Sequence, residues 1–184
     1  ILEVHAEVHK HDLTLVASHW TSQLTDKGDK EGVGRDKYAA LIHDAYTQAL
    51  KANPAVDWLV CGDFNDTPES DPVANKLHMT GDAKLVTSDA NPPMMYGLLS
   101  GKDPAQFGTH YYNKPLIYDH FGVSPGLLDN HGWGYVANSV QVPIDGLTRS
   151  AKRQPWRFGS KSDPAVGRGY SDHFPVVATF MVSP

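Results

Sequence analysis

The first half of the chain alternates between strand-like and helix-like hydrophobic patterns. Apolar and polar side chains alternate over residues 2–9, which predicts a strand with one buried face, and residues 13–18 predict a second strand. From residue 35 to 51 the apolar positions recur with a helical period. Residues 58–61 form a short, continuous apolar run, which is typical of a strand buried on both faces.

The second half favours short strands separated by long loops. Asp71-Pro72 supplies a cap and a first-turn proline, which predict a short helix that ends near Gly81. Residues 88–108 and 143–170 are expected to be irregular. The expected strands are 83–87, 116–124, 136–142 and 176–182. Strands outnumber helices and helices lie between strands, so we expect a single α/β (α+β) domain over residues 1–184.

Composition narrows the function classes. The chain has 184 residues, with 16 Lys and Arg against 21 Asp and Glu, a formal net charge of −5. This mild acidity argues against binding of nucleic acid by bulk charge, although a nuclease needs only a local basic groove. The single Cys excludes an intrachain disulfide and a cysteine-based zinc site. No apolar run approaches the ~20 residues of a membrane span.

A carboxylate and an amide follow directly after the buried strand. Asp63 and Asn65 are two residues apart, so in extended geometry they project to the same side. Such a pair suits an acceptor for a water proton or a metal beside a donor for a phosphoryl oxygen. A turn rich in Asx residues after a strand explains the same residues without any function.

Three further polar positions lie at strand ends. His19 ends the second strand, and Asp172-His173 precede the last one. Asp119 interrupts the apolar strand at 116–124, where it needs a partner such as histidine, because an unpaired buried carboxylate is costly. Each of these residues alone has a structural explanation. Together with Asp63 and Asn65 they are improbable as independent accidents.

In this order the segments resemble the endonuclease/exonuclease/phosphatase superfamily. The motifs are Ser-His-Trp at 18–20, Gly-Asp-Phe-Asn at 62–65, Tyr-Asp-His-Phe at 118–121 and Ser-Asp-His-Phe-Pro-Val at 171–176. The resemblance spans residues 1–182. It implies the deoxyribonuclease I-like four-layer sandwich, in which two β-sheets are flanked by helices, and this chain resembles its C-terminal portion.

The resemblance also implies catalytic roles. His173 would be the catalytic histidine at the scissile phosphate, and Asp119 would orient it. Asp63 would position or deprotonate the attacking water, and Asn65 would hold that water or a phosphoryl oxygen. His19 would contact the phosphate or assist the leaving group. The implied reaction is metal-assisted hydrolysis of a phosphoester.

The implied cofactor is Mg²⁺, with Mn²⁺ as a substitute, and Asp172 would lie at the metal. The family's principal metal ligand is a glutamate from the first half of its fold. Glu3 and Glu7 are expected to face outward and do not match that glutamate. We therefore expect an upstream segment or a partner chain to complete both the sandwich and the metal site.

Several substrate classes remain open. Residues 19–22, His-Trp-Thr-Ser, look closer to bacterial and often exported deoxyribonuclease-like members, which favours a phosphodiesterase or nuclease that is secreted or periplasmic. A phosphomonoesterase and a sphingomyelinase-like lipid phosphodiesterase are alternatives on the same fold. A non-catalytic binding module with a decayed site is the alternative from another class.

A basic stretch precedes the last motif. Residues 149–168 hold six Lys and Arg against one Asp, with aromatic residues interleaved. Arginines bind phosphates and aromatic rings stack on bases, so this stretch could form a wall of the substrate site. A solvated basic loop with Trp156 packed on the body explains it equally well. The candidate substrate-binding residues are Thr109, Lys114, Arg153, Trp156, Arg157 and Arg168.

Overall fold

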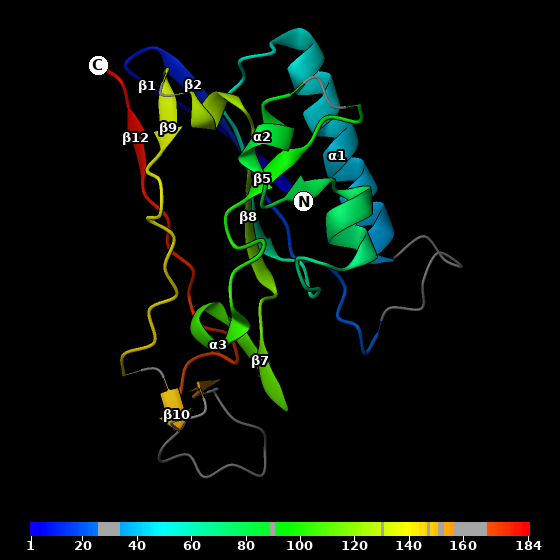
Figure 1. The fold of residues 1–184 in the computed structure, drawn as a ribbon, viewed down its shortest axis with the longest axis vertical. Helices are drawn as coiled ribbons and strands as arrows, with labels where there is room; N and C mark the ends of the chain where they lie inside the picture. The colour runs from blue at the N-terminus through cyan, green and yellow to red at the C-terminus, as the bar shows by residue number, and fades with distance from the viewer. Residues whose placement is uncertain (26–33, 89–90, 130, 147, 151–152, 157–168) are drawn as a thin grey trace.

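A six-stranded mixed sheet forms the centre of the computed structural model (Figure 1). The structure describes residues 1–184 apart from 26–33, 89–90, 130, 147, 151–152 and 157–168. In sheet order the strands are β1 (Leu2–Val8), β2 (His11–Ala17), β3 (Trp58–Asp63), β8 (Asp119–Val123), β5 (Met95–Gly97) and β4 (Met79–Thr80). This order places β3 and β8 side by side in the middle of the sheet.

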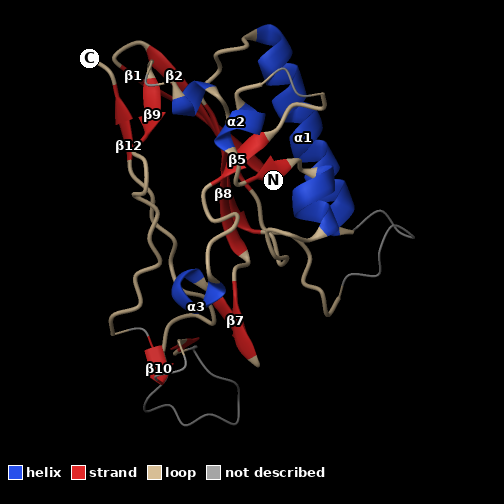
Figure 2. Cartoon of the chain, in the orientation of Figure 1, coloured by secondary structure: helices blue, strands red, loops and turns tan. Residues whose placement is uncertain are grey.

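Helix α1 (Arg35–Ala52) covers one face of the sheet, as Figure 2 shows. It confirms the helix predicted over 35–51. It forms the crossover between β2 and β3, which therefore run parallel. Its Ile42 and Tyr46 side chains are buried in a core cluster with Val16, Trp58 and Val60. No helix in the described part of the chain is both long and apolar enough to cross a membrane.

The opposite face of the sheet packs against a second, smaller pair of strands. These are β9 (Trp133–Tyr135) and β12 (Phe180–Val182), which run antiparallel. Leu13, Leu59 and Val123 belong to the core cluster on this side. Leu59 lies between Trp58 and Val60 in sequence, so β3 sends alternate side chains into two cores. This confirms a strand buried on both faces.

Strand β1 confirms the strand predicted at residues 2–9 but not its buried face. Val4 pairs with Leu15 across the antiparallel ladder, so the two side chains share a face of the sheet. Yet Val4 is 43% exposed and Leu2 is 61% exposed. The prediction of burial was wrong because β1 is an edge strand, and the neighbouring layer contacts β2 through β9.

Short elements make up most of the second half. The helical ones are η2 (Pro72–Lys76), α2 (Ala83–Val86), α3 (Pro104–Phe107) and η3 (Gly126–Leu128). The two remaining strand pairs are β6 (His110–Tyr112) with β7 (Lys114–Leu116), and β10 (Thr148–Ser150) with β11 (Gln154–Pro155). Elements α3, β7 and β10 lie together at the lower end of Figure 1.

Two predicted elements between residues 71 and 87 were wrong in extent or type. The helix that starts at Pro72 ends at Lys76 rather than near Gly81, and residues 79–80 form β4. Residues 83–86 form a helix, not a strand, because the Asp82 side chain accepts a hydrogen bond from the Lys84 N–H and caps it. A helix of four residues is too short to show a helical period.

Predicted strands in the last third were too long. The strand expected at 116–124 is split between β7 and β8, because the Tyr118 and Asp119 N–H groups donate to the Thr109 hydroxyl. Residues 136–142 contribute only an isolated bridge between Gln141 and Val177, and 176–182 pairs regularly only over β12. The regions expected to be irregular contain β5 and α3 in 88–108, and β10 and β11 in 143–170. In the predicted strands that were too long, the apolar side chains indicate burial and do not by themselves indicate strand pairing.

Gly62 allows β3 to continue to the site. Its φ of +140° lies in a region that L side chains rarely adopt, and a Cβ placed there would lie 1.9 Å from the Ser18 carbonyl oxygen. The close approach lets Ser18 N–H bond to Cys61 and Trp20 N–H bond to Asp63, which extends the β2–β3 pairing. Gly62 therefore fixes how the ends of β2 and β3 meet.

Replacing Gly62 with alanine is expected to lower the free energy of unfolding by about 2–4 kcal/mol, from overpacking and from the positive φ together. Gly101→Ala is the matched control, because Gly101 also has a positive φ but no atom lies within 4 Å of the place that an alanine methyl group would take. The control should cost only about 1 kcal/mol. Urea denaturation of both variants measures the difference, and equal losses would contradict the steric argument.

Candidate functional site

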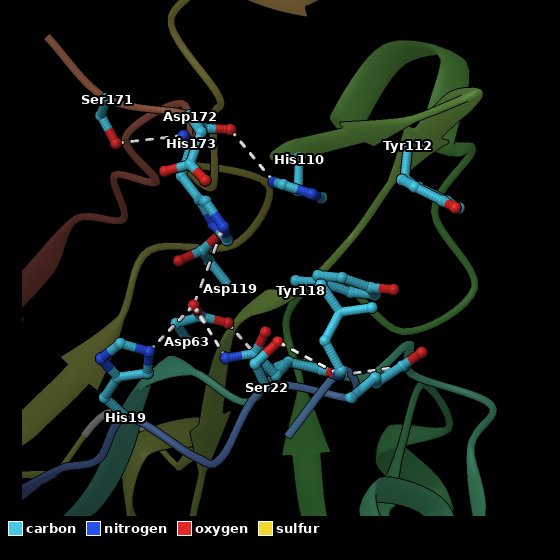
Figure 3. Close-up of a pocket in the computed structure, with 13 residues that line it drawn as sticks. His19, Ser22, Asp63, His110, Tyr112, Tyr118, Asp119, Ser171, Asp172 and His173 are labelled. Atoms are coloured by element: carbon cyan, nitrogen blue, oxygen red, sulfur yellow. Dashed lines mark hydrogen bonds and ion pairs between the residues drawn. The ribbon is translucent and has the colours of Figure 1, made fainter. Parts of the chain in front are cut away.

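Polar side chains gather where β3 ends and β8 begins (Figure 3). Asp63 and Asp119 are partners in the antiparallel β3–β8 ladder, so the register itself places the two carboxylates together. His173 reaches them from the segment before β12, and an isolated bridge between His110 and His173 holds that segment in place. The structure thus brings together residues from three distant parts of the chain.

His173 lies between the two carboxylates. Its Nδ1–H donates to Asp119 Oδ2 at 2.7 Å, and its Nε2 lies 3.8 Å from Asp63 Oδ2. Burial lowers the pKa of the imidazole, but the hydrogen bond and charge of Asp119, with the charges of Asp63 and Asp172, outweigh burial and leave the pKa raised. The Asp119 carboxylate therefore has the histidine partner that the sequence required.

Asp63 is a half-buried carboxylate held by its neighbour Asn65. Burial raises the pKa of Asp63, opposed by the hydrogen bond that its Oδ1 accepts from the Asn65 backbone N–H at 2.8 Å. The Asn65 amide donates to Asp63 Oδ2 at 3.2 Å and to the Trp20 carbonyl at 3.0 Å. Both amide hydrogens are used within the protein, and a contact of Asn65 with a phosphoryl oxygen, one of the two roles expected for it, stays a prediction. The side-chain oxygen of Asn65 remains able to accept a hydrogen bond from a water.

The expected extended geometry between Asp63 and Asn65 was also wrong. Asn65 has a φ of +51°, so the chain turns sharply there into a left-handed conformation that asparagine tolerates. The two side chains still meet, but through this turn and not through strand alternation. The sequence left open whether these residues form an Asx turn or a functional pair. The structure shows an Asx turn that also belongs to the polar cluster.

His19 lies on the other side of Asp63 from His173 in Figure 3. Its Nε2 is 3.5 Å from Asp63 Oδ2, and its side chain is 78% exposed. The backbone bonds on either side of it, from Ser18 and Trp20 to β3, fix the position of its Cα beside the site. Two imidazoles thus flank a single carboxylate oxygen.

These residues line an open cavity of about 580 Å³. The side chains around it are His19, Ser22, Gln23, Leu24, Asp63, Asn65, His110, Tyr112, Tyr118, Asp119, Ser171, Asp172 and His173. All six residues assigned to catalysis or metal binding from the sequence are among them. Their chemical roles stay predictions.

The predicted substrate residues fare differently. Thr109 is fully buried, and its hydroxyl accepts the backbone bonds at the start of β8, so it supports Asp119 rather than touching the cavity. Lys114 is exposed at the start of β7 and does not line the cavity. Arg153 donates to the Gly108 and Val142 carbonyls and lies over the Phe174 ring, which is a packing role. Trp156 does not line the cavity, and Arg157 and Arg168 lie outside the described residues.

An aromatic wall beside His173 was missed from the sequence. The His110 and Tyr118 rings stack at 5.3 Å with an interplanar angle of 10°, and His110 lies 4.5 Å from the His173 ring. Burial and the charge of His173 lower the pKa of His110. Side chains alternate along β6, so His110 and Tyr112 line the cavity while Thr109 is buried. The sequence indicated Thr109 as a substrate-binding candidate, and the structure places its neighbour His110 at the cavity instead.

Replacing Asp119 with asparagine is expected to lower the pKa of His173. The substitution removes both the charge and the carboxylate hydrogen bond of Asp119, which raise this pKa, while the burial that lowers it is unchanged. The stability that the raised pKa provides is present at pH below ~6.5 and is lost as the pH rises through the folded value, so Asp119→Asn should cost most at low pH. NMR titration of the His173 ring measures the shift. An unchanged pKa would contradict the pairing.

Two overlapping groups of side chains could hold a metal ion. Asp63, Asp119 and His173 form one, and His110, Asp172 and His173 form the other. In each group the ligand atoms lie within 4.8 Å of one another. Cation binding at this cavity is therefore compatible with the geometry of the described residues.

The mixed sheet has a helix on one face and a second strand layer on the other. These layers define part of a deoxyribonuclease I-like α/β sandwich, with a polar cluster at the ends of its central strands. The chain belongs to the endonuclease/exonuclease/phosphatase family, whose model matches residues 1–182. No curated protein sequence matches the chain.

Solved structures give the same fold at low identity. The mannosyl-6-phosphatase of Bacteroides thetaiotaomicron matches with a TM-score of 0.54 and 16% identity over 94% of this chain and 52% of that chain. D. rerio TDP2 in complex with a single-strand DNA product matches with a TM-score of 0.54 and 14% identity, over 98% of this chain and 60% of that chain. A mutant of Staphylococcus aureus beta toxin with bound magnesium ions matches with a TM-score of 0.50 and 14% identity, over 96% of this chain and 56% of that chain. The chain spans about half the length of these structures.

Proposed function

We propose that this chain forms part of a divalent-metal-dependent phosphoester hydrolase that cleaves phosphodiesters, nucleic acid in particular. The observation that carries the proposal is the position of His173, whose imidazole lies between the Asp119 and Asp63 carboxylates in an open cavity. An imidazole and a carboxylate this close can accept and donate protons around one bound phosphate. Family membership supports a hydrolase of this kind.

Asp63 is the proposed acceptor of the proton of the attacking water. Burial raises the pKa of its carboxyl, which makes the carboxylate a stronger base than a solvated one. The bonds from the Asn65 backbone and amide fix its orientation. The side-chain oxygen of Asn65 is the proposed acceptor of a hydrogen bond from that water, which gives Asn65 a positioning role.

His173 is the proposed contact to the scissile phosphate. Its raised pKa favours the charged imidazolium, which stabilises negative charge on a phosphoryl oxygen. Asp119 holds its Nδ1–H and so fixes the ring. His19, on the far side of Asp63, is the proposed donor to the leaving oxygen, because its exposed ring can reach the cavity.

The donors fit a magnesium-class ion by their chemistry. Asp63, Asp119 and Asp172 line the cavity, and carboxylate oxygens are the ligands that Mg²⁺ and Mn²⁺ prefer. We propose that Asp172 contributes to holding the ion. When bound, such an ion supplies positive charge that polarises the phosphoryl group.

The aromatic wall supports nucleic acid as the substrate. The stacked His110 and Tyr118 rings lie next to His173, and Tyr112 extends this side of the cavity. Aromatic faces beside a phosphate site can stack on nucleobases, whatever their sequence. The substrate would place its phosphate at His173 and a neighbouring base against this wall.

The test is hydrolysis of a chromogenic phosphodiester and its matched monoester by the full-length gene product, with Mg²⁺, with Mn²⁺ and with EDTA. We expect cleavage of the diester that depends on the metal ion, followed by cleavage of DNA or RNA. A preference for the monoester would replace the proposal with a phosphatase. Activity that survives EDTA would contradict the metal dependence.

A further inference from the structure

A nitrogen-rich group of side chains lies at one edge of the cavity. His110 comes from β6, and Asp172 and His173 come from the segment before β12. Each offers one ligand atom, and the three atoms lie within 4.8 Å of one another. The backbone bridge between His110 and His173 fixes the two histidines relative to each other, and their rings lie 4.5 Å apart.

The donor set selects a different metal from magnesium. Two imidazoles and one carboxylate suit Zn²⁺ and its first-row neighbours, whereas Mg²⁺ prefers oxygen ligands throughout. Zinc bonds of ~2.0–2.2 Å in a tetrahedron place ligand atoms ~3.3 Å apart. The group is therefore wider than a zinc site by at most about 1.5 Å. The Asp172 side chain is exposed and can close this gap by rotating.

Both imidazoles already have the second hydrogen bond that is typical of metal-binding histidines. His173 Nδ1–H donates to Asp119 at 2.7 Å, and His110 Nδ1 lies 3.1 Å from the Asp172 carbonyl oxygen. A carbonyl oxygen only accepts, so His110 carries its proton on Nδ1. In the neutral form of each ring Nε2 carries no proton, and the other nitrogen is held by an acceptor, as in the outer coordination shell of zinc sites.

We propose that His110, Asp172 and His173 bind a zinc-class divalent transition metal ion, and that this ion inhibits the enzyme. The three protein ligands leave a fourth position open to the cavity, as in zinc sites that keep a water. A bound ion occupies the lone pair of His173, so the ring can no longer carry the proton that would face a phosphoryl oxygen of the substrate. The inhibition rests on the proposed function, whereas the binding does not.

The test combines metal binding with activity. Zn²⁺ is titrated into the metal-free full-length gene product by calorimetry, and Co²⁺ replaces it for absorption spectroscopy of a tetrahedral site. His110→Phe keeps an aromatic ring against Tyr118 and removes both ring nitrogens, including the one that would bind the metal ion. We expect this variant to weaken zinc binding more than ~100-fold, since loss of even an outer-shell partner costs ~10–100-fold. His131→Ala is the control, because His131 lies outside the cavity lining and its side chain is 91% exposed.

The outcomes separate the two claims. Zinc binding by the wild type and by His131→Ala, with loss in His110→Phe, supports the site. Inhibition of the wild type by zinc that His110→Phe relieves supports the regulation. Absent binding, or equal affinity in His110→Phe, overturns the site. If zinc binds through His110 but the protein cleaves no phosphoester, the site stands and the proposed function fails.

Discussion

Replacing His173 with alanine is expected to lower the rate of phosphodiester cleavage by about 10²–10³-fold, the usual cost of removing one group that stabilises charge in the transition state. The imidazole is bonded to Asp119 at 2.7 Å and lies 3.8 Å from Asp63, so alanine removes the group that joins both carboxylates. It also leaves Asp119 without its imidazole partner and like charges facing each other. Steady-state kinetics on the chromogenic diester measure the loss.

The comparison needs a histidine variant that leaves the cavity intact. His131→Ala serves, because its side chain is 91% exposed and absent from the cavity lining. Circular dichroism and a thermal melt establish that both variants fold. A loss of less than tenfold in His173→Ala, with the fold intact, would refute the assigned mechanism.

The second large effect is expected from Asp63→Asn, at about 10²–10³-fold in rate. Asparagine keeps the size of the side chain but cannot take a proton from water. It also loses the charge that faces the His19 and His173 rings at 3.5 Å and 3.8 Å. The pH–rate profile is the diagnostic measurement, because the acidic limb that reports a carboxylate base should disappear.

Asp57→Asn is a matched control for this variant. Asp57 is likewise a buried carboxylate whose pKa is raised by burial, and it also accepts a backbone N–H, from Trp133 at 2.9 Å. It lies outside the cavity lining. We expect Asp57→Asn to lose stability but keep the rate within about threefold. Equal rate losses in the two variants would mean that Asp63 acts only through folding.

The sequence predicted the central elements because their signals are long and regular. The helix at 35–51 spans several turns, and the strand at 58–61 is apolar throughout, so both stand out from their surroundings. The cost of an unpaired buried carboxylate indicated a histidine partner for Asp119, and the family resemblance implied that His173 is this partner and that Asp63 belongs to the same site. The order of the four motifs along the chain is what showed the family resemblance.

What the sequence could not predict depends on contacts between distant residues. The helix at 83–86 has four residues and is identified by its Asp82 cap, not by a period. The split between β7 and β8 depends on the Thr109 hydroxyl, which lies nine residues before Tyr118. The phase of β6, and with it His110, follows from the bridge to His173, which sequence patterns do not show.

The pairing of Asp119 with His173 joins residues 54 positions apart, and His173 approaches Asp63 across an even longer stretch of chain. Contacts of this separation carry a large loop-closure entropy, because a long stretch of chain must be closed before they are made. A molecule in which the C-terminal segment has undocked from the sheet would lack the imidazole beside Asp119. Under the proposed mechanism such a molecule would cleave no phosphoester, so the rate of cleavage would report whether the C-terminal segment is docked.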